Sequence, residues 1–158
     1  MKQKITPFLW FDKNAEEAIN FYVSIFKNSR IISITRYSDF MPEMKGKVLT
    51  AVFELEGVPF MAIDGGPMYH FTEAISLQVD CDTQEEVDDL WNKLTADGGV
   101  EQCGWLKDKY GLSWQIVPNI LGKLFSDPDS VKVSRMAKAM MQMKKLDIAA
   151  LVKAFNGE

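Results

Sequence analysis

The chain has 158 residues and a formal net charge of −4; 47% of its residues are hydrophobic and 25% are charged. This length suits one compact domain or two small halves that share a core, and the composition excludes a disordered or low-complexity chain. The acidic balance, with lysines scattered among acidic residues, disfavours a nucleic-acid or membrane-surface partner. With one His and two Cys, the chain is short of ligands for a zinc site and of bases for most His-based catalysis.

The two cysteines, Cys81 and Cys103, are far apart in the sequence and form no Cys-x-x-Cys element. In a chain without a secretory leader, isolated cysteines predict buried, reduced thiols. The apolar run at residues 7–11 is too short for a signal peptide, and no window approaches the roughly 18–20 apolar residues of a membrane span. We therefore expect a soluble, cytoplasmic protein with no membrane partner.

The first half of the chain begins with an aromatic, apolar run at residues 4–11, which predicts a strand. Asn14 and Glu17 have the spacing of a capping box and precede an apolar stripe that runs to about residue 27, as in an amphipathic helix. The remaining strands of this half are expected at residues 31–37, 48–55 and 58–64.

The second half repeats these signals. Residues 74–80 alternate with period two, and Thr83 with Glu86 forms another capping box before a helical apolar stripe. Two further strands, at residues 102–106 and 112–117, are separated by a hairpin signal at 108–111.

The sequences of the two halves can be aligned with each other. Leu9 falls on Leu77 with an offset of 68 in the first strand, the helices match at 69, and the last strands match at 54. Three matches in the same element order predict an internal βαβββ repeat. We expect an α+β fold in which residues 1–118 form one domain of two modules, 4–64 and 74–118, that build a curved, mostly antiparallel sheet with outer helices.

Strand alternation assigns the two faces of this sheet. Ile75, Leu77 and Val79 should pack beneath the helix, whereas Ala74, Ser76 and Gln78 should face the other, concave side. The repeat adds further residues to the concave side, namely Thr6, Phe8, Trp10, Met61 and Gln115. A concave sheet lined by aromatic and a few polar side chains predicts a ligand site.

Residues 119–158 are expected to form a helical extension. Residues 127–130 begin a helix with a stripe of Met136, Met140 and Met143, and Asp147 precedes a last short helix. The stripe fits adaptable packing, on the domain or on a dimer partner, and it also fits a lid over the cavity.

Three stretches of the chain, residues 9–22, 65–77 and 103–118, resemble the PhnB-like branch of the vicinal oxygen chelate superfamily, which includes glyoxalase and bleomycin-resistance proteins. The last stretch, Cys-Gly-Trp-Leu-Lys-Asp-Lys-Tyr-Gly-Leu-Ser-Trp-Gln-Ile-Val-Pro, is the most specific. Similar sequences carry the label 3-demethylubiquinone-9 3-methyltransferase-like. The resemblance implies the paired-module fold and a homodimer, because such modules complete their barrels by pairing.

Enzymes of this superfamily hold a divalent metal with His, Glu or Gln side chains at four equivalent strand positions. Our register places these positions at Thr6, Met61, Ala74 and Gln115. Gln115 is the one ordinary ligand type among them, so we expect no metal and no other cofactor. A Gly-x-Gly-x-x-Gly nucleotide motif is missing too, which argues against methyl transfer from S-adenosylmethionine.

The candidate pocket residues are Trp10, Glu54, Met61, Gln78, Gln115 and His70. Several have structural alternatives: Trp10 as dimer or core packing, His70 as a surface or interface residue, and Glu54 as a solvated strand-end carboxylate. In the same way, hairpin packing and an exposed ion pair account for Trp105, Lys107 and Asp108. No catalytic residue is assigned.

Our leading interpretation is binding of a small molecule in the concave sheet, with the ligand left open. The alternative is a divergent lyase, dioxygenase or methyltransferase with relocated residues, such as Glu54 and His70 beside Gln115. A third interpretation is a scaffold whose Met-rich helices bind a protein.

Overall fold

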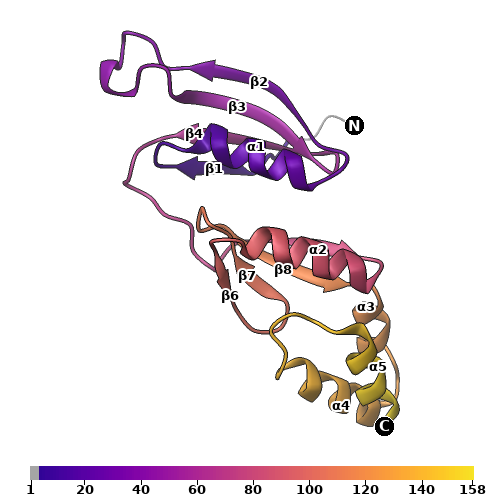
Figure 1. Cartoon of the computed structure of the whole chain (residues 1–158). Coiled ribbons are helices and arrows are strands. Elements are labelled where there is room, and N and C mark those ends of the chain that lie inside the picture. The colour runs from indigo at the N-terminus through magenta and orange to yellow at the C-terminus, as the bar shows by residue number, and fades with distance from the viewer. Residues whose placement is uncertain (1–3) are drawn as a thin grey trace. The chain divides into compact units, whose positions relative to one another are not determined.

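The computed structural model describes residues 4–158 (Figure 1). The chain divides into two compact units, which are Met1–Phe71 and Thr72–Glu158. Each contains one four-stranded sheet with a helix across one face.

Unit 1 pairs its strands in the order β1-β4-β3-β2. Strand β1 runs parallel to β4, whereas the other two pairs are antiparallel. The elements of this unit are β1 Phe8–Phe11, α1 Ala15–Ile25, β2 Arg30–Arg36, the short 3-10 helix η1 Pro42–Met44, β3 Val48–Leu55 and β4 Val58–Asp64.

Unit 2 has the equivalent order, β5-β8-β7-β6, with β5 parallel to β8 and the other pairs antiparallel. The shared order confirms the predicted βαβββ repeat and the α+β class. The elements of unit 2 are β5 Ser76–Cys81, α2 Gln84–Thr95, β6 Gly99–Val100, β7 Trp105–Lys107, β8 Ser113–Pro118, α3 Ile120–Phe125, α4 Ser130–Met140 and α5 Ile148–Asn156.

One face of each sheet packs on its helix and forms the core. In unit 1, Phe53 and Ala62 are fully or almost fully buried together with Tyr22 of α1. In unit 2, Leu106 and Trp114 are buried together with Leu94 of α2.

We call the opposite side of each sheet its open face. Alternation places Trp10, Glu54 and Met61 on the open face of unit 1, and Ser76, Gln78, Trp105, Lys107, Ser113 and Gln115 on that of unit 2.

Strand pairing corrects the offset between the first strands of the two modules. Met61 and Gln115 are equivalent at the offset of 54 for the last strands. Phe8 lies opposite Met61, and Gln78 lies opposite Gln115. The equivalent of Phe8 is therefore Gln78, and the offset between the first strands is 70 rather than 68. The alternation of side chains has period two, so the sequence pattern cannot distinguish registers that differ by two residues.

This shift also corrects the placement of two residues. Strand β5 begins at Ser76, so Ala74 and Ile75 precede it. Ile75 is 73% exposed, and the expectation that it packs beneath the helix is wrong. The module-2 equivalent of Thr6 is therefore Ser76, not Ala74.

The two helix starts behave differently. At α2 the predicted cap is confirmed: Thr83 Oγ1 accepts a 3.2 Å hydrogen bond from Glu86 N, and the Glu86 carboxylate accepts one from Asp82 N. At α1 the capping-box prediction is wrong, because Asn14 makes no side-chain cap bond. The buried Asp64 replaces it, with Oδ1 accepting from Ala15 N at 2.8 Å.

The segment before β7 differs from the expected strand at 102–106. Strand β7 is limited to Trp105–Lys107, and it follows a turn in which Cys103 and Gly104 have φ values of 59° and 84°. The short strand β6, at Gly99–Val100, was not predicted because its two residues carry no periodic signal.

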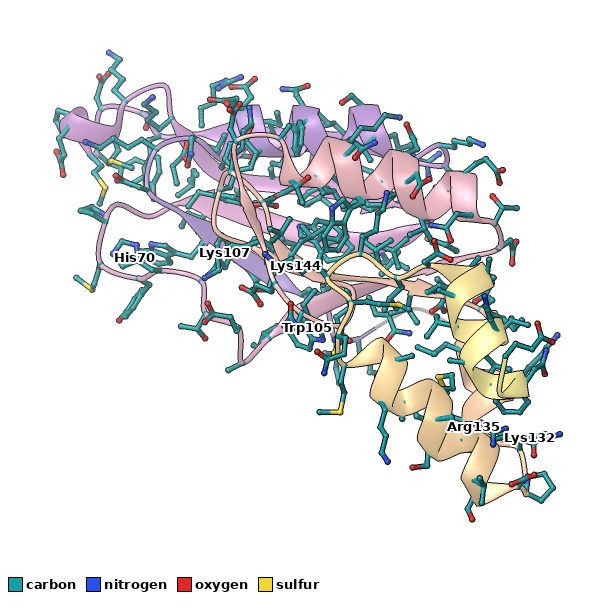
Figure 2. All side chains as sticks on the ribbon, turned by 60° about the horizontal axis from the view of Figure 1, so that its bottom comes forward. His70, Trp105, Lys107, Lys132, Arg135 and Lys144 are labelled. Carbon is teal, nitrogen blue, oxygen red and sulfur yellow. The ribbon has the colours of Figure 1, made fainter. Side chains whose placement is uncertain are left out.

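Helices α3, α4 and α5 enclose a small hydrophobic core of their own. Its buried members are Leu121, Leu124, Met136, Leu146, Leu151 and Phe155, with Met140 and Met143 packed against it. The methionine stripe therefore packs within unit 2. Arg135 closes this core by donating to the carbonyl oxygens of Ala154 and Phe155 (Figure 2). In the part of the chain that the structure describes, no helix is long and apolar enough to span a membrane.

Candidate functional site

The open face of unit 2 carries two cross-strand rows of polar and aromatic side chains. One row places Ser76, Ser113 and Lys107 side by side on β5, β8 and β7. The next row places Gln78, Gln115 and Trp105 on the same three strands. The two predicted pocket residues of this unit are thus direct neighbours, and sequence alternation had placed both on this side.

Hydrogen bonds connect part of this face. Gln115 Nε2 donates to Ser76 Oγ at 2.8 Å, and Gln78 Nε2 donates to Asp80 Oδ1 at 2.8 Å. Gln115 is half-buried, and its amide carbonyl oxygen still offers two lone pairs. The amide of Gln115 is thus oriented by a neighbour on its NH₂ side and retains an acceptor.

Lys107 forms an ion pair with Glu73, which lies in the segment just before β5 (Figure 2 labels Lys107). The hydrogen bond from Lys107 lowers the pKa of Glu73, and the same bond raises the pKa of Lys107. Lys107 therefore takes part in an ion pair, as expected, but its partner is Glu73 and not Asp108.

Asp108 differs from the expectation. It is 3% exposed, and its carboxylate accepts hydrogen bonds from Tyr110 N, Leu112 N and the indole of Trp114. It organises the turn between β7 and β8 instead of forming a surface pair.

Ser113 is the residue on this face that sequence reasoning missed. It is fully buried, and its Oγ is the one buried side-chain nitrogen or oxygen atom without a hydrogen-bond partner among residues 4–158. Structures rarely leave such an atom unpaired. A serine between Leu112 and Trp114 was the available sequence signal, because an apolar or β-branched residue would be usual there.

The open face of unit 1 carries Trp10, Met61 and Glu54. Trp10 Nε1 donates to the carbonyl oxygen of Gly66 at 2.8 Å, and the ring of Tyr69 packs edge-on at 5.0 Å. The loop after β4 therefore holds the indole in place, and Gly65 fits beside the ring because it has no Cβ. The indole N–H of Trp10 is already used.

The two titratable candidates of unit 1 come from different segments, Glu54 from strand β3 and His70 from the loop after β4. Glu54 is ion-paired with Arg30 at 3.0 Å, and its side chain is 24% exposed. His70 lies in the exposed loop after β4 (Figure 2).

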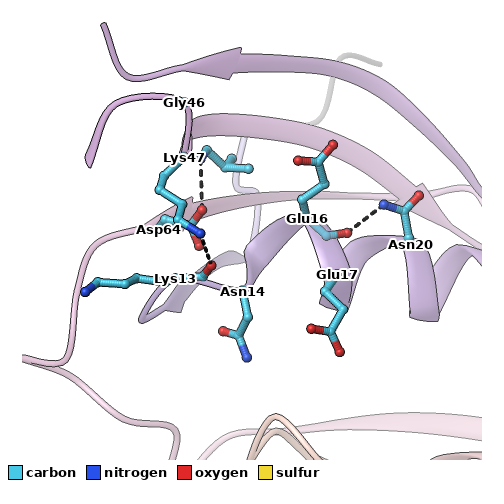
Figure 3. A pocket seen from close by; sticks show the side chains of 9 residues that line it. Lys13, Asn14, Glu16, Glu17, Asn20, Gly46, Lys47 and Asp64 are labelled. Atoms are coloured by element: carbon cyan, nitrogen blue, oxygen red, sulfur yellow. Dashed lines mark hydrogen bonds between the residues drawn. The ribbon is translucent and has the colours of Figure 1, made fainter. Parts of the chain in front are cut away.

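A hollow of about 410 Å³ lies at the start of α1, on the helix side of the sheet (Figure 3). Its polar wall is internally paired: Asp64 Oδ2 accepts from Val48 N at 2.8 Å, and Glu16 holds Arg36 with two hydrogen bonds. Arg36 accordingly lowers the pKa of Glu16. None of the predicted pocket residues lines this hollow. Asp64 in its wall caps helix α1, so the polar groups here have a structural role.

At the four positions where the resemblance leads us to expect metal ligands, with Ser76 now in place of Ala74, the side chains are two hydroxyls, a thioether and an amide, from Thr6, Ser76, Met61 and Gln115. This set does not fit a divalent ion, which prefers carboxylate and imidazole ligands. In residues 4–158, no three His, Cys, Asp or Glu side chains form a group that could hold a metal.

The repeated β-α-β-β-β unit, with one parallel strand pair in each sheet, defines the vicinal oxygen chelate class of proteins. Within this class, residues 3–117 match the family described as 3-demethylubiquinone-9 3-methyltransferase. The chain belongs to this family, the PhnB-like branch of the superfamily.

Solved structures agree with this assignment. A PhnB protein from Bacillus cereus, named for the same methyltransferase, is 45% identical over 73% of this chain and 99% of that one, with a TM-score of 0.69. Protein PA1353 from Pseudomonas aeruginosa is 21% identical over 74% of this chain and 98% of that one, with a TM-score of 0.61. The fosfomycin resistance protein FosX from Listeria monocytogenes is 15% identical over 80% and 99%, with a TM-score of 0.59, and shares the fold. No curated protein gave a significant match.

Proposed function

We propose that the protein binds a small molecule on the open face of its sheets and does so without a metal. The observation that carries this proposal is the row of Gln78, Gln115 and Trp105. It combines an oriented amide, whose oxygen is available as an acceptor, with a half-buried indole. Aromatic walls with a few fixed polar groups are the usual lining of small-molecule sites.

The methyltransferase name of the family is not the function that these residues support best. Methyl transfer from S-adenosylmethionine commonly uses a parallel sheet with a glycine-rich first turn, and each sheet here has a single parallel pair. The metal-dependent chemistries of the superfamily require a donor set that Met61 and Ser76 do not provide. Binding or sequestration therefore fits better than metal-dependent turnover.

A thermal-shift screen of aromatic and amphipathic metabolites tests the proposal, because a ligand of the folded state raises the unfolding temperature. At least one compound should raise it for the unaltered chain and for Asn20→Ala, whose exposed side-chain amide donates to the carbonyl oxygen of Glu16 within helix α1. Gln115→Ala should reduce this shift. Equal shifts in Gln115→Ala, or no binding compound at all, would overturn the proposal.

We also propose that the protein is a homodimer. Strand β1 is at the edge of its sheet, and its Phe8 side chain is 51% exposed. Edge strands with exposed apolar residues tend to pair with another chain. Sedimentation velocity should show a dimer that Phe8→Glu weakens, while Phe40→Glu, in an exposed loop, leaves it intact. A monomer at all accessible concentrations would contradict this.

A further inference from the structure

We propose that the open face of unit 2 takes the carboxylate of a small aromatic or apolar acid, held by Lys107, Ser113 and Ser76, with the side chain of Glu73 occupying Lys107 until the ligand displaces it. This inference rests on the proposed binding function and specifies the ligand class of the same face.

Ser113 lies in the middle of this row. Its hydroxyl is buried and unpaired, an arrangement that is less stable than one in which the hydroxyl is hydrogen-bonded. Ser113 is directly flanked by Lys107 on one side and Ser76 on the other. Because Ser113 is fully buried, a ligand oxygen atom must displace the side chains that cover this row, and it would then give the Ser113 hydroxyl its missing acceptor.

The side chains on either side of Ser113 can donate hydrogen bonds to a ligand. The Ser76 hydroxyl accepts from Gln115 Nε2, so its own proton is available to donate to a ligand. Lys107 carries three donors and a full positive charge, and one donor is used by Glu73. Two hydroxyls and an ammonium along one row form a donor set suited to an oxyanion.

Glu73 is an internal example of the contact that we propose for the ligand. It is itself a carboxylate bound to Lys107, so this cation already holds the functional group that we assign to the ligand. The Glu73 side chain is 53% exposed, and exposed ion pairs contribute little to stability because water and salt screen the charges. A ligand carboxylate that also reaches Ser113 and Ser76 would make more hydrogen bonds to the row than Glu73 does with Lys107 alone.

The charges around Lys107 select the type of anion. Glu73 and Glu101 both act electrostatically on Lys107, and Asp80 lies on the same face. These acidic groups repel a phosphate dianion more strongly than a carboxylate monoanion. Trp105, in the adjacent row on the same strand as Lys107, offers a ring for the body of the acid (Figure 2).

Isothermal titration calorimetry with benzoate tests this inference, with the uncharged benzamide and dianionic phenyl phosphate as comparison probes. Benzoate should bind most tightly of the three. Lys107→Met should weaken benzoate binding about tenfold or more, since a charge-assisted bond is lost. The matched control is Lys109→Met, in the adjacent turn, which should leave binding unchanged. Glu73→Gln should strengthen binding several-fold by removing the competing carboxylate.

Ser113→Ala separates binding from folding. This variant should unfold at the same or a higher temperature, because it removes an unpaired buried hydroxyl, and yet bind benzoate more weakly. Benzoate binding that is absent, or unaffected by both Lys107→Met and Ser113→Ala, would overturn the inference. If neutral compounds still bind through Gln115 in that case, the proposed binding function stands and only the carboxylate assignment falls; if nothing binds, both fail.

Discussion

The indole N–H of Trp114 donates a 2.8 Å hydrogen bond to Oδ2 of Asp108, and both side chains are almost fully buried. The other carboxylate oxygen accepts from the backbone N–H groups of Tyr110 at 2.8 Å and Leu112 at 3.1 Å. One carboxylate thus fixes the β7–β8 turn and a large core side chain together. This hairpin also presents Lys107 and Ser113, so the buried Asp108 positions the open face of unit 2.

Asp108→Asn should be strongly destabilising. The asparagine amide has only one accepting oxygen. Its NH₂ group, a donor, must therefore face either the indole N–H of Trp114 or the two backbone N–H groups, which are donors too and lose their acceptor. We expect a loss of about 2–4 kcal/mol in the free energy of unfolding, measured by urea denaturation. Asp39→Asn, in an exposed pair with Lys45, is the control and should cost less than about 1 kcal/mol. Similar losses in the two variants would refute the role assigned to Asp108.

The start of α1 gives a second prediction. Asp64→Ala should cost about 2 kcal/mol or more, because Ala15 N and Val48 N both lose their buried acceptor. Asn14→Ala should cost less than about 0.5 kcal/mol, since Asn14 makes no cap bond. Chemical denaturation of both variants measures the comparison. The reverse order would show that Asn14 caps the helix in solution.

The contacts of Asp108 and Asp64 could not be predicted from the sequence. The repeat and the Thr83 cap were predicted from sequence spacing, and these predictions are confirmed. Strand alternation failed at Ile75, which precedes β5 and is exposed. Asp64 caps a helix 49 residues away, and nothing in its local pattern distinguishes it from a solvated strand-end acid. The lysine partner expected near Asp108 instead binds Glu73, 34 residues from Lys107.

The face of the candidate site was predictable, whereas its central row was not. Alternation placed Gln78 and Gln115 together, and the structure pairs them. The two-residue error in register assigned Ala74 to the position that Ser76 occupies. Residues two apart in a strand face the same side, so alternation could not reveal this error. Ser113 gained significance only when its hydroxyl proved to be buried and unpaired.

Gly104 gives a third prediction, with Gly111 as its matched control. Both have φ values near +85°, at 84° and 87°. A Cβ on Gly104 would lie 2.8 Å from the carbonyl oxygen of Ile116 and 3.1 Å from a methyl group of Leu146, whereas Gly111 has open space. Alanine at 111 should cost about 1 kcal/mol for backbone strain, and alanine at 104 about 3 kcal/mol or more. Thermal unfolding of both variants measures this, and equal costs would contradict the close packing at Gly104.

Gln84 gives a fourth prediction, about the attachment of the C-terminal helices. Its Oε1 accepts from Ile148 N at 2.8 Å, and its Nε2 donates to Leu146 O at 3.2 Å. Gln84→Ala should therefore speed hydrogen exchange at Ile148 by about tenfold, equivalent to about 1.4 kcal/mol of local stability. Lys145→Ala, which removes a surface pair with Asp88, should leave that exchange unchanged. Unchanged exchange in Gln84→Ala would mean that the core around Met136 alone holds the segment.

The thiol of Cys81 gives the last prediction, a pH dependence. Burial, together with the nearby Glu86, Asp80 and Asp82 carboxylates, raises the pKa of Cys81 from its ordinary value of 9.0 to about 12. Between these two values the unfolded thiol loses its proton while the folded thiol keeps it, so the unfolded state binds fewer protons. The free energy of unfolding must then fall as the pH rises through this window, by up to about 1.4 kcal/mol per pH unit for this group.

Below pH 9 this contribution is absent, because both states hold the proton. Urea midpoints measured from pH 8 upward should therefore decline more steeply for the unaltered chain than for Cys81→Ala, which has no thiol at this position. Cys103→Ala is the matched control and should decline as steeply as the unaltered chain, because it retains Cys81. Parallel curves for the unaltered chain and Cys81→Ala would show that the buried thiol ionises as readily in the folded state as in the unfolded one.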